Sequence, residues 1–277
     1  MKLYGVDFTS SPSRRKPVTI AEGRHENGRL RLTALHCLSS LSQFGEWLHE
    51  PGPWLAAFDL PFALPAQLLR FHGWPVQWAA QMRHLQSMSR AALREACQAY
   101  CNSRPKGRKF AHRATDMLAA SSPSMKWVNP PVAYMLHEGA PRLLEAGITL
   151  PGMWQGDPDR IALEAYPGMV ARSISRQSYK SDERRLQTME RQQTREQIVQ
   201  ALEAGSHPWQ IACDWQAFRP SLIADGSADL LDAAICLMLA AWGWQRRQHN
   251  YGLPAFDPDE GWIVGCELYT SPGKAQS

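Results

Sequence analysis

The segment LAAFDLPFALP (residues 55–65) decides the fold, because it is an apolar strand that ends in an acid and prolines. The segment before it, SLSQFGEWLHE (40–50), spaces Leu41, Phe44 and Leu48 along one face of a helix. A strand that is reached through a helix usually lies parallel to its neighbour in the sheet. The two segments therefore predict the parallel part of an α/β sheet.

Upstream of this unit, three strands are expected over residues 2–8, 16–23 and 28–38. The third alternates leucine and alanine with arginine and threonine, which is typical of a half-buried strand. The tetrapeptide HENG (25–28) is a turn sequence. Short links between consecutive strands indicate an antiparallel meander, so we predict a mixed sheet: three antiparallel strands, then parallel strands, flanked by helices.

The remaining chain is expected to complete a single domain over residues 1–277, with a helical insertion over about 66–150. Within the insertion, the clearest helical pattern covers residues 76–101. Beyond it we expect a strand in 159–168, a long helix over 181–205 that Gly205 ends, a buried helix over 226–248 and a last strand in 260–269.

The bulk composition is that of an ordinary soluble protein, with 44% hydrophobic residues and a net charge of +4. This charge permits a nucleic-acid partner without arguing for one. No signal-peptide, C-x-x-C or zinc pattern occurs, and the longest apolar stretch, 233–244, is shorter than the ~20 residues of a membrane span. We therefore expect a cytoplasmic protein with reduced cysteines and no membrane partner.

Acidic residues occupy comparable places in several of the expected elements. Asp7, Asp59 and Glu164 each lie at the end of an apolar strand, and Asp229 and Asp232 share one face at the start of the buried helix. Strand ends of an open α/β sheet meet at one edge, where ligands bind. Clustered carboxylates without histidine or cysteine suit Mg²⁺ or Mn²⁺, and paired ions of this kind cleave phosphodiesters.

Each acid also has a structural explanation, which the sequence leaves open. Asp229 and Asp232 would complement the dipole of their helix, and Asp225 would cap it. Glu164 would pair with an arginine such as Arg160 or Arg172.

Several segments, in this order, resemble the family known as domain of unknown function 429, and the resemblance covers nearly the whole chain. The segments are YGVDFTSSPSRRKP (4–17), AAFDLPFALP (56–65), SPSMKWVNPPVAYMLHEGAPRLL (122–144), ALEAYPG (162–168), DLLDAAICLMLAAW (229–242) and EGWIVG (260–265). The resemblance implies a nuclease of the RNase H-like fold, in which a metal-activated water is the nucleophile.

The same resemblance assigns roles to the acids. Asp7 matches the first-strand acid of RNase H-like nucleases, Asp59 the fourth-strand acid, and Asp232 the acid of the late helix, with Asp229 beside it. Glu164 has no fixed counterpart there. We thus expect Asp7, Asp59, Asp232 and Glu164 to be catalytic, and Asp7, Asp59, Asp229 and Asp232 to hold Mg²⁺ or Mn²⁺.

Basic residues of the insertion are candidate contacts for the nucleic-acid backbone, which arginine and lysine bind without reading sequence. The candidates for substrate binding are Arg108, Lys109, Arg113 and Lys126. A second basic group over residues 172–185, which includes Lys180, would flank the same edge. The spacing of Arg113 and Asp116 also fits a simple helix ion pair.

Two alternative functions remain open from the sequence. One is an ATP-binding protein of the actin-like or kinase type, in which DFTSS (7–11) would be the phosphate loop. Phe8, however, stands where that loop needs a glycine for close backbone approach. The other alternative is a non-catalytic protein that binds nucleic acid, in which the acids would not converge.

Overall fold

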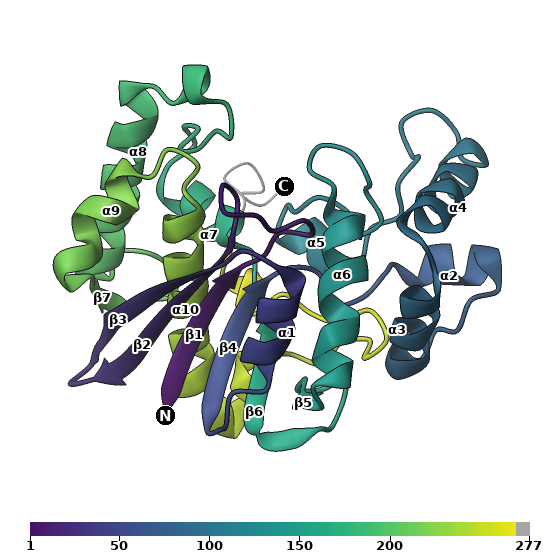
Figure 1. Ribbon diagram of the computed structural model, residues 1–277, viewed down its shortest axis with the longest axis horizontal. Helices are drawn as coiled ribbons and strands as arrows, with labels where there is room; N and C mark the ends of the chain where they lie inside the picture. Colours follow the sequence, from purple (N-terminus) through teal and green to yellow (C-terminus); the bar gives the residue numbers. More distant parts are fainter. Residues whose placement is uncertain (270–277) are drawn as a thin grey trace, which may run out of the picture.

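The computed structural model describes residues 1–269, which form a mixed α/β fold around a seven-stranded sheet of order β5-β6-β4-β1-β2-β3-β7 (Figure 1). The strands are β1 (Lys2–Asp7), β2 (Val18–Glu26), β3 (Arg29–Leu38), β4 (Trp54–Asp59), β5 (Ile148–Thr149), β6 (Asp157–Glu164) and β7 (Ala212–Asp214). Strand β2 runs antiparallel to β1 and β3, and the other neighbours are parallel. This confirms the predicted mixed sheet.

Helices cover both faces of this sheet (Figure 1). They are α1 (Leu41–Leu48), α2 (Ala66–His72), α3 (Trp78–Ser87), α4 (Arg90–Asn102), α5 (Ala114–Leu118), α6 (Val132–Glu145), α7 (Pro167–Ile174), α8 (Met189–Ala204), α9 (Arg219–Ala224) and α10 (Asp229–Gln245). One apolar core joins the sheet to α7, α8, α9 and α10, and a second joins the opposite face to α1, α3, α4 and α6. Among the described residues, no helix has the length and apolar character that a membrane crossing requires.

Several element boundaries differ from the sequence prediction. The helix expected over residues 76–101 is two helices, because Ser89 accepts a hydrogen bond from the Ala92 amide and begins α4 anew. The long helix expected from residue 181 begins only at Met189, although Gly205 ends it in the left-handed conformation as predicted. The last strand, expected in residues 260–269, is wrong: Ile263 makes a single bridge to Glu164 before a short 3₁₀ turn.

Helix α10 lies directly against β1 because the contact residue is Gly5. A Cβ atom on Gly5 would lie 2.0 Å from the backbone nitrogen of Leu237 and 2.1 Å from the carbonyl oxygen of Ala233. No side chain fits there, so the first turns of α10 pass close over the end of β1. This packing brings the acids of the helix to the acids of the sheet edge.

Candidate functional site

Asp7 and Asp59 lie side by side at the ends of β1 and β4, as partners in the register of two parallel strands. Side chains along a strand alternate between the two faces of the sheet. Leu3 and Leu55 belong to the core beneath α10, and Asp7 and Asp59 lie four residues further along, which is an even step. Both carboxyl groups therefore face α10.

Asp232 approaches the same place from α10, and its side chain is fully buried. Its carboxylate accepts a 2.7 Å hydrogen bond from the hydroxyl of Tyr179 and a 2.5 Å ion pair from the ammonium of Lys180. The backbone of Tyr179 is in turn fixed, because the buried guanidinium of Arg195 donates to its carbonyl at 2.7 Å. The segment that carries Tyr179 and Lys180 is thus fixed both by its side-chain contacts to Asp232 and by its backbone contact to Arg195.

The four acids Asp7, Asp59, Asp229 and Asp232, called the acid cluster below, lie close enough to interact electrostatically. Burial raises the pKa of Asp7 well above its usual value, and Asp232 and Asp59 raise it further. Burial also raises the pKa of Asp59 to about 7, while Lys180 opposes this shift. One ammonium therefore does not neutralise this group of carboxyls, and negative charge here remains costly.

Asp229 and Asp225 lie at the start of α10 with different roles. Burial raises the pKa of Asp229, which Lys16 opposes. Asp225 accepts hydrogen bonds from the amides of Ser227 and Leu230 at 3.1 and 3.0 Å, so it organises the first turn of the helix. These contacts favour the capping role for Asp225.

The acid cluster opens on a cavity of about 760 Å³, called the main cavity below. Asp7, Asp59, Asp229 and Lys180 line one side of it. Arg172 is part of another wall, where its guanidinium donates to the carbonyl oxygen of Ala119 at 2.8 Å. The same group lies over the rings of Tyr166 and Tyr269, 5.1 and 5.6 Å from their centroids. Carboxyl groups and hydrogen-bonded polar groups therefore both line the cavity.

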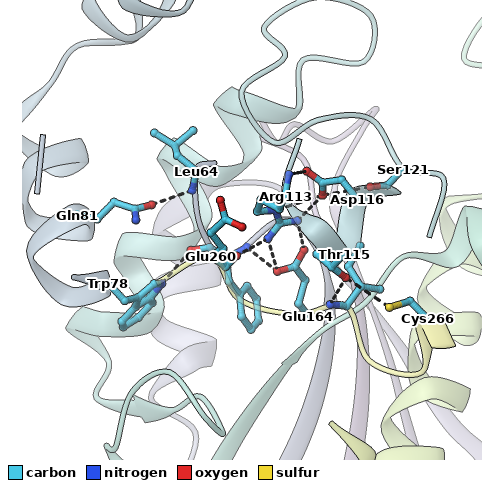
Figure 2. Close-up of polar contacts among 12 residues, drawn as sticks. Leu64, Trp78, Gln81, Arg113, Thr115, Asp116, Ser121, Glu164, Glu260 and Cys266 are labelled. Carbon is cyan, nitrogen blue, oxygen red and sulfur yellow. Dashed lines mark hydrogen bonds and ion pairs between the residues drawn. The ribbon is translucent and has the colours of Figure 1, made fainter. Parts of the chain in front are cut away.

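Glu164 belongs to a different arrangement, in which a buried arginine neutralises it (Figure 2). Arg113 donates to its two carboxylate oxygens at 2.8 and 2.6 Å, and the amide of Phe62 adds a 3.0 Å bond. Arg113 also pairs with Asp116 at 2.8 Å, and the side chains of all three charged residues are at most 3% exposed. Burial raises the pKa of Glu164, and Arg113 counteracts that shift.

Strand parity explains why Glu164 lies apart from the acid cluster. Its register partner on β4 is Phe58, one residue before Asp59, and Phe58 belongs to the core on the other face of the sheet. A shift of one residue turns a side chain to the opposite face. Glu164 therefore faces the helical segment that carries Arg113, although it lines the same main cavity and still interacts electrostatically with Asp59.

The candidate substrate-binding residues do not gather at one place. Arg108 and Lys109 are exposed and Lys126 is partly buried, whereas Arg113 is buried in the network with Glu164. Lys109 lines a second cavity of about 450 Å³, away from the main cavity. The side chain of Arg113 is committed to Glu164 and Asp116, which favours the ion-pair explanation for it.

No group of three or more His, Cys, Asp and Glu side chains within residues 1–269 is arranged to hold a metal ion. The contacts of Asp232 give a physical reason, because both of its oxygens have partners in Tyr179 and Lys180. Asp7 and Asp59 share a hydrogen bond between their side chains. In this arrangement the ammonium of Lys180 compensates part of the negative charge of the cluster.

Two residues of the site were not predicted from the sequence. Tyr179 lies 53 positions from Asp232, and Arg195 lies 16 positions from the carbonyl group that it fixes. The sequence feature that could have indicated Tyr179 is YKSDE (179–183), where a tyrosine and a lysine follow a serine-rich segment. From the sequence alone, Lys180 is only one member of the basic group over residues 172–185.

Comparison with known proteins identifies the chain at the level of a family. No curated protein and no solved structure matches it. A family model, described as "Protein of unknown function (DUF429)", matches residues 5–255, which is most of the chain and includes every member of the acid cluster. This chain therefore belongs to the DUF429 family, as its sequence segments indicated.

Proposed function

We propose that this protein is a metal-dependent phosphodiester hydrolase that acts on nucleic acid, with its active site at the acid cluster. The observation that carries the proposal is the meeting of Asp7, Asp59 and Asp232 beside the main cavity, which Asp7 and Asp59 line. The raised pKa values of Asp7 and Asp59 mean that the fold keeps carboxyl groups together at a cost in stability. Such a cost is typical of a functional site.

We also propose that the fold is RNase H-like. The support is the strand order β3-β2-β1-β4-β6, with β2 antiparallel, together with acids at the ends of β1 and β4 and on the late helix α10. This combination is the one that the resemblance implies. Residues 66–147 add α2 to α6 between β4 and β5 without adding a strand, which supports their description as a helical insertion.

The donor chemistry of the acid cluster fits Mg²⁺ or Mn²⁺, since the available ligands are carboxylate oxygens and the charge is incompletely neutralised. Asp7 and Asp59 would hold the cation, with Asp229 and Asp232 as further ligands. When bound, such a cation acidifies water and stabilises the charge that develops on the phosphate. The side chain of Lys180 is 44% exposed, so it has room to leave Asp232.

The residues around the acid cluster have separate roles in this proposal. Lys180 balances the carboxylates while the site is empty of substrate. Tyr179 orients Asp232 through its hydroxyl group, and Arg195 positions Tyr179. Glu164 and Arg113 join the end of β6 to the helical segment and shape the cavity wall, so they support the site rather than take part in the chemistry.

The alternative functions find less support. Phe8 is 3% exposed and packs against Phe44, so the residue after Asp7 is committed to the core instead of a phosphate loop. The described residues contain one sheet, whereas actin-like proteins close two such domains on a nucleotide. A purely binding role does not explain why the fold raises the pKa values of Asp7 and Asp59.

The experiment that tests the proposal is cleavage of labelled DNA and RNA strands with Mg²⁺ or Mn²⁺. Asp7→Asn and Asp59→Asn should each reduce cleavage to background while thermal melting shows a folded protein. Asp182→Asn is a matched control, because Asp182 also lines the main cavity but is 69% exposed and pairs with Lys16. Full cleavage by both cluster variants would contradict the proposal.

A further inference from the structure

The second cavity lies at the C-terminal end of α4, in the helical insertion. Its lining consists of Gln98, Cys101, Asn102, Lys109, Phe110 and Trp127. The rings of Phe110 and Trp127 are partly buried, with centroids 5.7 Å apart and planes inclined at 50°. Aromatic faces, side-chain amides and an ammonium group are the groups that bind a nucleobase by stacking and hydrogen bonding.

A positively charged loop lies next to this cavity in the sequence and contributes Lys109 to its lining. Arg104, Lys106, Arg108 and Lys109 are exposed on the loop 103–109, called the basic loop below. Among the described residues none of these four forms an ion pair, and Arg104 lies 5.8 Å from the ring centroid of Tyr100. Unpaired cations on one loop are available to a phosphate backbone.

The two aromatic rings are carried on backbone that is already fixed. The amide of Ala111, next to Phe110, donates to the buried sulfur of Met125 at 3.2 Å. The carbonyl of Lys126, next to Trp127, accepts a 2.8 Å bond from the amide of Ala133 at the start of α6. A ligand that stacks here therefore does not have to order the loops first, which favours binding.

We propose that the second cavity binds unpaired bases of a single-stranded nucleic acid, whose phosphates lie along the basic loop. Bases of a duplex are stacked on their neighbours and cannot enter a side-chain pocket, so the site favours single strands. The loop from Trp127 leads directly to Asn129, Pro130 and Pro131, which line the main cavity. Continuation of the strand along this loop to the acid cluster rests on the function proposed above, whereas the binding itself does not.

The test is fluorescence anisotropy with a short labelled poly(dT) strand and with a labelled duplex of equal length, in EDTA so that no cleavage occurs. The single strand should bind at least about tenfold more tightly than the duplex. Trp127→Leu should weaken single-strand binding about tenfold, which is the scale of one lost base stack. Trp262→Leu is the matched control, because Trp262 is also partly buried but lines neither cavity.

Lys109→Ala provides a second variant at an exposed position, where the fold is not at risk. It should weaken binding and reduce the slope of log affinity against log salt by about 0.7, the value for one phosphate contact on a single strand. Equal affinity for duplex and single strand, or equal binding by the Trp127 and Trp262 variants, would overturn the inference. All of these measurements are made in EDTA without cleavage, so a failure of the cleavage proposal does not affect their interpretation.

Discussion

Glu164, which is buried, and Asp59, which is partly buried, lie at the ends of neighbouring parallel strands, yet their charges are compensated to different degrees. Glu164 receives a bidentate arginine and a backbone amide, which satisfy its charge. For Asp59, burial raises the pKa to about 7 and Asp232 adds to the rise, while Lys180 opposes it only in part. The comparison shows that position at the end of a strand does not by itself determine how the charge of an acid is compensated. The degree to which the fold neutralises its charge distinguishes the two.

Replacement of Arg113 by methionine should have the largest effect on stability. It leaves the buried carboxylates of Glu164 and Asp116 without their cation, which costs about 3–5 kcal/mol of unfolding free energy. Urea denaturation at neutral pH measures the loss. The control is Arg185→Met, whose side chain is 82% exposed and should change stability by less than about 0.5 kcal/mol. Similar losses of unfolding free energy in both variants would contradict the structural role assigned to Arg113.

Replacement of Lys180 by methionine should have the next largest effect, and it acts on the other acid group. Without metal, Asp232 loses its ammonium partner, so the variant should lose about 2 kcal/mol of unfolding free energy, allowing for the exposure of Lys180. Mn²⁺ should then raise the melting temperature of this variant more than that of the wild type. An equal rise in both proteins would show that Lys180 and the cation do not compete.

Amide substitutions compare the two acids directly. Glu164→Gln weakens the bonds to Arg113 and should destabilise the protein by about 2 kcal/mol. Asp59→Asn removes a repelling carboxyl and should stabilise the metal-free protein by about 1 kcal/mol at pH 8. Denaturant midpoints in EDTA give both values. Changes of the same sign would contradict the distinction between the two acids.

The smallest expected effect is the contribution of Asp59 to the pH dependence of the unfolding free energy. Its folded pKa of about 7 exceeds the ordinary 3.8, so between these values the folded state binds more protons than the unfolded state. Unfolding free energy should therefore decrease as pH rises from about 4 to 7, by at most about 1.4 kcal/mol per pH unit for this group. The decrease should be shallower in Asp59→Asn, and parallel curves for the two proteins would refute the assignment.

Much of the sheet and part of the acid cluster could be predicted from the sequence. The strands β1 to β4 and the apolar helix α10 have strong patterns, and their order alone brings Asp7, Asp59 and Asp232 to one edge. Strands β5 and β7 have two and three residues, too few for a pattern to appear. The apolar run near Ile263 suggested a strand, but it packs in the core after a single bridge.

The partners of the acids were less predictable, for two physical reasons. The face on which Glu164 lies depends on the register between β4 and β6, which a one-residue shift reverses. Arg113 meets Glu164 across 51 residues, and Tyr179 meets Asp232 across 53, through loops whose paths no periodicity indicates. The residue types were visible in the sequence, whereas their pairing depends on tertiary packing.

The most direct test of the central claim is calorimetric titration of Mn²⁺ into the wild type, Asp59→Asn and Glu164→Gln. If the acid cluster holds the cation and Glu164 does not, Asp59→Asn should lose Mn²⁺ binding while folded Glu164→Gln retains it within a few-fold of the wild type. Binding that survives in Asp59→Asn, or that is lost in folded Glu164→Gln, would contradict the claim.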